Sequence, residues 1–134
     1  ILNVALKKIK KFQIYGDDWD TPDGTCIRDY IHIMDLAQGH ILALNYLLKS
    51  KPQLINFNLG TGHGTSVLSL IKTFEEVNSI NIPYEYTSRR KGDLSILIAD
   101  NSKVKEILNW IPKRNITDMC RDGWNWILCN PNGY

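Results

Sequence analysis

An amphipathic helical segment, followed by a short apolar segment and a glycine-rich turn, constrains the fold more than any other feature of this sequence. Four apolar residues recur at the spacing of one helical face within residues 35–49: Ala37, Ile41, Leu44 and Leu48. The apolar segment 54–60 then breaks into the turn, and Thr65 or Ser66 can cap a second helix that runs to about residue 78. The order of strand, turn and helix predicts a mixed α/β fold.

Further elements are expected on both sides of this unit. The sequence predicts extended segments at residues 11–15, 26–33 and 82–87, and helices at residues 1–9, 102–109 and 116–129. Residues 16–25 carry Asp, Pro and Gly at the density of a turn. The chain starts at Ile1 without a capping residue before its first helix, so we expect the sequence to begin within an element.

Composition excludes several classes of function. The chain has 134 residues, of which 43% are hydrophobic and 22% charged, as expected for one soluble globular unit. Its net charge is only +2, and its one lysine cluster, within residues 7–11, lacks interleaved aromatic residues, so we expect no nucleic-acid partner. No apolar run approaches the length of a membrane span, and no signal peptide is evident.

The cysteines fit a cytoplasmic protein. Cys26, Cys120 and Cys129 are an odd number with wide gaps, which is typical of reduced thiols. The histidines His32, His40 and His63 lack matching ligand spacing, so no metal site is predicted. No nucleophile motif and no paired carboxylates stand out, and the sequence by itself shows no catalytic machinery.

Three arginines indicate a site for an anion. Arg89 and Arg90 precede Gly92, and a guanidinium pair on a turn suits a phosphate. Arg28 lies among residues that are expected to be buried. Because an unpaired buried charge is costly, Arg28 must pair either with Asp29 or another carboxylate, or with an anionic ligand.

The turn at residues 60–65, with the sequence GTGHGT, matches a dinucleotide fingerprint only weakly. It lacks the third glycine at the required spacing, and no acidic residue follows at the expected distance. We therefore expect a tight turn and a helix entry there.

Four blocks in order resemble the UDP-glucose 4-epimerase family. They are IYGDDWDTPDGTCIRDYIHIMDLAQGHILAL at 14–44, NFNLGTGHGTSVLSLI at 56–71, RRKGDLSILIAD at 89–100 and GWNWILCNPNGY at 123–134. The resemblance implies an extended short-chain dehydrogenase/reductase that binds NAD tightly, oxidises C4 of a UDP-hexose and returns the hydride to the other face. It also implies a homodimer when the protein is full length.

The same resemblance implies that residues 1–134 are the C-terminal, UDP-sugar-binding part of such an enzyme, with the N-terminal NAD-binding Rossmann segment absent. In the family, the first part carries the glycine-rich NAD fingerprint and a catalytic YxxxK motif. No tyrosine of this sequence is followed by lysine four residues later, so no catalytic or cofactor-binding residue is carried over. We expect the apolar faces of the segments 31–40 and 56–60, which pack on that Rossmann sheet in the family, to be exposed here.

Substrate contacts are carried over residue by residue. Arg28 and Arg90 resemble the pair that holds the UDP diphosphate, and Asp93 resembles the acid that binds the ribose. The remaining matches are Gln13 and Tyr15, whose backbone flanks the uracil, Val67, which lies against the nucleoside, and Leu97, which lies near the sugar.

The identity of the sugar is open. At the position of Leu97 some family members have a large tyrosine, and others have a small residue and accept N-acetylated sugars. Alternatives to UDP-glucose are therefore UDP-glucuronate, UDP-arabinose and UDP-N-acetylglucosamine epimerases. A dTDP-glucose dehydratase is disfavoured by the second half of the 14–44 block and by the RRKGDL sequence. A non-catalytic nucleotide-sugar binding module is the alternative from another class.

Overall fold

The computed structural model describes residues 1–131 and residue 133. Two residues of the last block that resembles the family, Asn132 and Tyr134, lie outside the described residues. The helices are α1 (Leu2–Ala5), α2 (Ile33–Lys49), α3 (Val67–Asn78), α4 (Ser102–Leu108) and α5 (Ile116–Cys129). The strands are β1 (Phe12–Tyr15), β2 (Ile27–Arg28), β3 (Thr65–Ser66), β4 (Tyr84–Thr87) and β5 (Ile96–Leu97). The expected mixed α/β class is confirmed.

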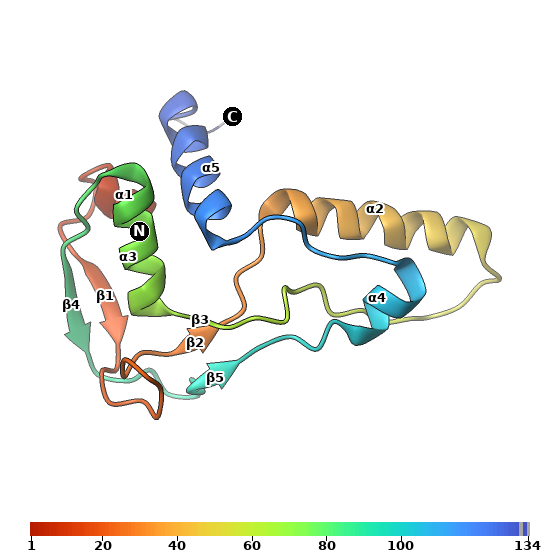
Figure 1. The fold of residues 1–134 in the computed structure, drawn as a ribbon, viewed down its shortest axis with the longest axis horizontal. Helices are drawn as coiled ribbons and strands as arrows, with labels where there is room; N and C mark the ends of the chain where they lie inside the picture. The colour runs from red at the N-terminus through yellow and green to blue at the C-terminus, as the bar shows by residue number, and fades with distance from the viewer. Residues whose placement is uncertain (132, 134) are drawn as a thin grey trace.

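The strands form two small sheets. β1 pairs with β4 in parallel, with Phe12 opposite Tyr84. β2 lies between β3, to which it is antiparallel, and β5, to which it is parallel. Figure 1 shows an elongated molecule, with β1, β4, α1 and α3 at one end and α2 and α4 at the other.

The hydrophobic core lies at the end that holds β1 and β4. It is formed by the buried residues Val4, Ile14, Ile71, Phe74, Ile82 and Cys120. α3 packs on α5 there, and the rings of Phe74 and Trp124 meet edge to face with centroids 6.0 Å apart. The core therefore fixes β1 and the N-terminus of α3 relative to each other.

Side chains cap three helices, and two of the caps, Ser66 and Asn115, are residue types that favour this position. Ser66 accepts a hydrogen bond from Ser69 N at the start of α3. Asn115 and Asp118 form a capping box at α5, in which each side chain accepts from the backbone N–H of the other. His32 caps α2 by accepting from Met34 N, so this helix begins two residues earlier than predicted.

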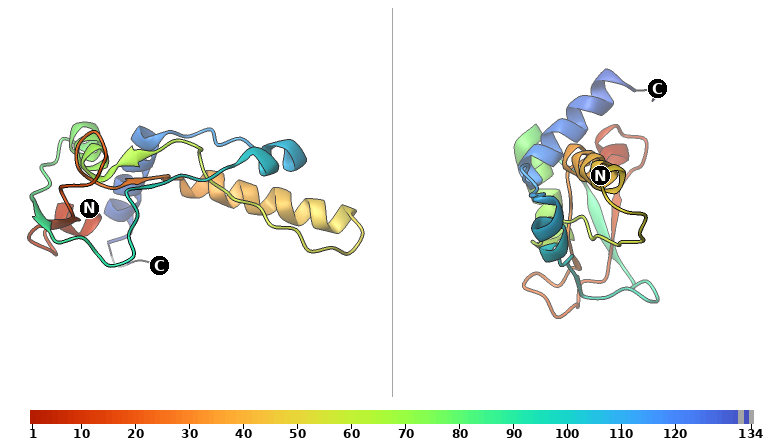
Figure 2. Two further views of the ribbon diagram at one scale, coloured as in Figure 1. Left: turned by 90° about the horizontal axis from the view of Figure 1, so that it is seen from below. Right: turned by 90° about the vertical axis from the view of Figure 1, so that its right-hand side faces the viewer.

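α2 is a long rod with little of the chain packed on it. The chain after it runs back along the helix towards β3 (Figure 1, Figure 2). Three members of its predicted apolar stripe, Ile41, Leu44 and Leu48, are 59%, 56% and 75% exposed. No helix among residues 1–131 and 133 is both long and apolar enough to cross a membrane.

One predicted element is absent and two are shorter than predicted. Residues 54–60 form no strand, since their backbone does not pair with any strand among the described residues. Leu54 at the start of this segment is 93% exposed. The extended segment 26–33 is a strand only at β2. The first helix ends at Ala5 because Lys7 adopts the left-handed conformation, with φ of 58°.

Candidate ligand-binding site

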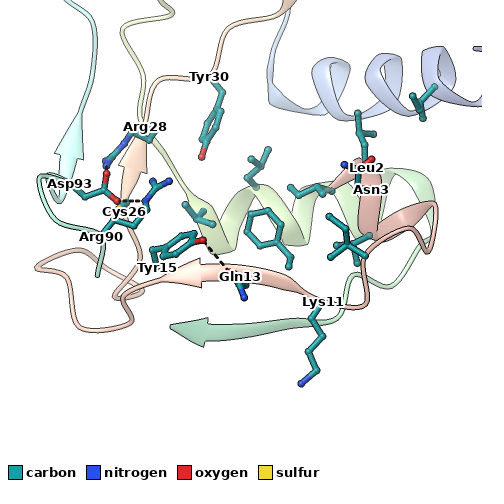
Figure 3. A pocket seen from close by; sticks show the side chains of 17 residues that line it. Leu2, Asn3, Lys11, Gln13, Tyr15, Cys26, Arg28, Tyr30, Arg90 and Asp93 are labelled. Carbon is teal, nitrogen blue, oxygen red and sulfur yellow. Dashed lines mark hydrogen bonds and ion pairs between the residues drawn. The ribbon is translucent and has the colours of Figure 1, made fainter. Parts of the chain in front are cut away.

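A cavity of about 930 Å³ lies between the two sheets and α3. Six of the seven predicted site residues line it: Gln13, Tyr15, Arg28, Val67, Arg90 and Asp93. They come from β1, β2, the first position of α3 and the turn before β5, which are far apart in the sequence. Figure 3 shows Tyr15, Arg28, Arg90 and Asp93 gathered at one end of the cavity, and Leu2, Asn3 and Lys11 at the other.

The carboxylate of Asp93 lies between two guanidiniums. Arg90 Nε donates to one of its oxygens at 2.9 Å, and Arg28 Nη2 lies 3.8 Å from the other. Arg28 also donates from Nη1 to the carbonyl oxygen of Ile27 at 2.8 Å. The side chains of Arg28 and Asp93 are only 22% and 20% exposed, so the carboxylate supplies the partner that the buried arginine requires. Asp29, the other candidate partner, is engaged elsewhere.

Arg90 is held over an aromatic ring. Its guanidinium carbon lies 4.6 Å from the centroid of Tyr15. The hydroxyl of Tyr15 in turn donates to Gln13 Oε1 at 3.1 Å (Figure 3). β1 therefore orients Arg90 through a stacked ring, while the remaining guanidinium N–H groups are able to meet an anion.

The two consecutive arginines do not act as a pair. Arg89 does not line the cavity; its guanidinium carbon lies 4.0 Å from the ring centroid of Trp19, and its Nε donates to Asp18 at 2.7 Å. This hydrogen bond holds the pKa of the Asp18 carboxyl below its usual value. The indole of Trp19 donates to Tyr15 O at 2.9 Å. Arg89 therefore fastens the turn that carries Arg90 to the loop after β1.

The glycine-rich turn is filled by a protein carboxylate. Asp29 accepts from the backbone N–H groups of Thr61 at 2.8 Å and Gly62 at 2.9 Å, and from Thr61 Oγ1 at 2.5 Å. Burial alone would raise the pKa of Asp29, but these bonds and one from Ala99 N hold it below its usual value. Asp29 therefore takes the backbone N–H groups of Thr61 and Gly62, and the chain passes from this turn through β3 into α3, which confirms the predicted helix entry.

Leu97 is separate from the other six residues. It lies on β5, is 57% exposed, and lines an adjoining cavity of about 520 Å³. Arg28 lines both cavities, so the two spaces meet at this arginine. Leu97 therefore lies beyond the arginine end of the larger cavity, on the strand that pairs with the strand of Arg28.

The larger cavity is also lined by residues that the sequence-based assignment leaves out, among them Cys26 and Tyr30, which lie close to Arg28 in the sequence. Cys26 is 6% exposed. Burial raises the pKa of the Tyr30 phenol above its usual value, although Arg28 acts in the opposite direction. The period of an extended chain could have identified Tyr30, since side chains two residues apart share a face.

The side chains of two of the three histidines, His32 and His40, have partners within the fold. His32 Nδ1 accepts from Met34 N at 3.1 Å, and its Nε2 lies 3.3 Å from Asp122. His40 Nδ1 contacts Leu36 O at 2.8 Å. Within the part of the chain that the structure describes, no group of three or more His, Cys, Asp or Glu side chains could hold a metal ion.

Known proteins resemble the chain over its whole length. The UDP-glucose 4-epimerase of Dictyostelium discoideum is 46% identical over 134 residues, which cover 100% of this chain and 39% of that protein. The enzyme of Yersinia enterocolitica is 47% identical with the same coverage. The chain thus spans about 39% of the length of the curated relatives it matches, and the match falls in their C-terminal part.

Solved structures share the fold. The UDP-glucose 4-epimerase of Bifidobacterium longum in complex with NAD+ and UDP is 45% identical, with a TM-score of 0.91 over 99% of this chain and 39% of that chain. A family model described as GDP-mannose 4,6 dehydratase matches residues 1–123. The chain therefore belongs to the GDP-mannose 4,6-dehydratase family, and over its whole length it resembles UDP-glucose 4-epimerases.

Proposed function

We propose that residues 1–134 are the UDP-sugar-binding part of a UDP-glucose 4-epimerase, an enzyme that interconverts UDP-glucose and UDP-galactose. The observation that carries this proposal is the convergence of Arg28, Arg90 and Asp93 on one cavity. Two guanidiniums beside one carboxylate suit a diphosphate joined to a ribose, because the arginines match phosphate oxygens and the carboxylate accepts from hydroxyls.

The walls of the cavity fit the rest of a nucleotide. Val67 at the start of α3 offers an apolar side chain, and β1 offers Gln13 and Tyr15 at the opposite wall. The chain's own residues would thus bind and orient a UDP-sugar. NAD is the cofactor proposed for the parent enzyme, and it would be held by residues outside this chain. The solved relative from B. longum carries both NAD+ and UDP.

Calorimetric titration of the chain with UDP and with UDP-glucose tests this proposal. We expect both ligands to bind, and an Arg28→Ala, Arg90→Ala double variant to lose measurable binding of both. Arg121→Ala is the matched control, because this arginine pairs with Asp118 and Asp122 on α5, away from the cavity. Failure of a chain with a native circular dichroism spectrum to bind either ligand would contradict the proposal.

A further inference from the structure

The phenol of Tyr30 shares the cavity with the arginine cluster. Tyr30 follows Arg28 by two residues, and both side chains line the cavity. Figure 3 shows the Tyr30 hydroxyl pointing into this space, towards the wall on which Tyr15 lies. The aromatic ring is partly buried, and Tyr30 also lines a second cavity of about 590 Å³ on the side of Thr61 and Trp110.

The two phenols of the cavity differ in their hydrogen bonds. The hydroxyl of Tyr15 donates to Gln13 Oε1 at 3.1 Å. The hydroxyl of Tyr30 has no hydrogen-bond partner among residues 1–131 and 133. Since burial raises its pKa above the usual value, this phenol is protonated at neutral pH and has a proton to donate. Partly buried tyrosine hydroxyls normally find an acceptor.

We propose that Tyr30 donates a hydrogen bond from its hydroxyl to a phosphate oxygen of the nucleoside diphosphate that Arg28 holds. This inference rests on the proposed function. A phosphate oxygen is the acceptor that the surroundings favour, because Arg28 lies two residues away on the same wall and Arg90 faces it from the turn before β5. Tyr30 would then be a ligand-binding residue beside the arginine pair.

The test is titration of the Tyr30→Phe variant with UDP and with UDP-glucose. Loss of one hydrogen bond to a charged acceptor is expected to weaken UDP binding about tenfold. UDP-glucose should be weakened by the same factor, because both ligands carry the same diphosphate. Tyr46→Phe, in which the ring lies edge-on to Phe57 on the α2 side of the molecule, is the matched control and should bind as the wild type does.

A second readout separates binding from folding. The Tyr30→Phe variant retains the ring, so its melting temperature should equal that of the wild type. Combining Tyr30→Phe with Arg28→Ala in a double-mutant cycle should show non-additive losses, because both groups are expected to contact one phosphate. Pyrophosphate, used with all variants, reports the phosphate contact without a nucleoside or a sugar.

The outcomes are distinct. If Tyr30→Phe binds UDP as tightly as the wild type does, while Arg28→Ala does not, the inference is wrong and the proposed function stands. If only UDP-glucose binding is weakened, the hydroxyl contacts the sugar and the phosphate assignment is overturned. If the folded wild-type chain binds neither ligand, the proposed function fails and this inference fails with it.

Discussion

Arg90 donates a hydrogen bond of 2.9 Å to Asp93, so the carboxylate occupies a donor that also faces the cavity. The other oxygen of Asp93 lies 3.8 Å from Arg28. The carboxylate therefore offsets part of the positive charge that the two arginines bring to the site. An incoming anion must share these donors with Asp93 or displace it. Removing the charge of Asp93 should therefore change the affinity of the site for anions.

Replacing Asp93 with Asn is expected to separate two kinds of ligand. Pyrophosphate, which has no ribose, should bind roughly threefold to tenfold more tightly, because a repelling charge next to the arginines is removed. UDP should gain less, since its ribose hydroxyls lose a charged acceptor. Titration of both ligands at low salt measures the difference. Equal gains for the two ligands would show that Asp93 does not contact the nucleoside.

Removing Arg89 should loosen the loop after β1. In the Arg89→Ala variant, Trp19 loses the guanidinium over its ring, and Asp18 loses its partner. We expect faster chymotrypsin cleavage after Trp19 and UDP binding weakened about threefold, because the turn that carries Arg90 is no longer fastened. Lys91→Ala is the control from the same exposed turn. Unchanged cleavage and affinity would show that the turn holds its position without Arg89.

Local signals identify most of the helices. Ser66 and the Asn115 to Asp118 capping box begin α3 and α5 where the residue types place them, because these contacts are made within one turn. The strand expected at residues 54–60 depends on a pairing partner, which no local pattern specifies. The apolar residues of this segment are compatible with a strand, but the described part of the chain supplies no strand to pair with it, so no strand forms.

The site was predicted by resemblance more than by pattern. Composition and spacing single out Arg28, Arg89 and Arg90 without showing which of them share a cavity. The structure separates Arg89 from Arg90, because Trp19 and Asp18 draw one guanidinium away. The separation of Arg89 from Arg90 depends on the contact between Arg89 and Asp18, which lie 71 residues apart in the sequence. Such contacts follow from the fold and not from the local sequence.

Asp35 is expected to stabilise the attachment of α2. Its carboxylate, 1% exposed, accepts from the backbone N–H groups of Lys113 at 2.9 Å and Arg114 at 2.8 Å, and from Arg114 Nη1 at 2.6 Å. Burial alone would raise the pKa of Asp35, but these bonds hold it below the usual value. Asp35→Asn leaves donors without a charged acceptor and should lower the free energy of unfolding by about 2 kcal/mol at pH 7.

The sign of the pH dependence follows from the lowered pKa. The contribution of Asp35 is complete well above the unfolded-state pKa of about 3.9 and is lost as the pH falls through the lower folded-state pKa. Urea unfolding of the wild type and of Asp35→Asn should therefore differ most at neutral pH and converge in acid. Asp20→Asn, in an exposed loop position, should show no difference at neutral pH. A constant gap between wild type and Asp35→Asn at all pH values would contradict this.

The cysteines should differ in reactivity towards a thiol reagent. Burial raises the pKa of Cys120 to about 11, and this thiol lies in the core beside α3, whereas Cys129 is exposed near the end of α5. At pH 8 the reagent should modify Cys129 rapidly and leave Cys120 unmodified until the chain unfolds, because the thiolate is the reactive form. Cys129→Ser should remove the fast phase. Rapid modification of Cys120 in that variant under native conditions would mean that the contact between α3 and α5 opens readily.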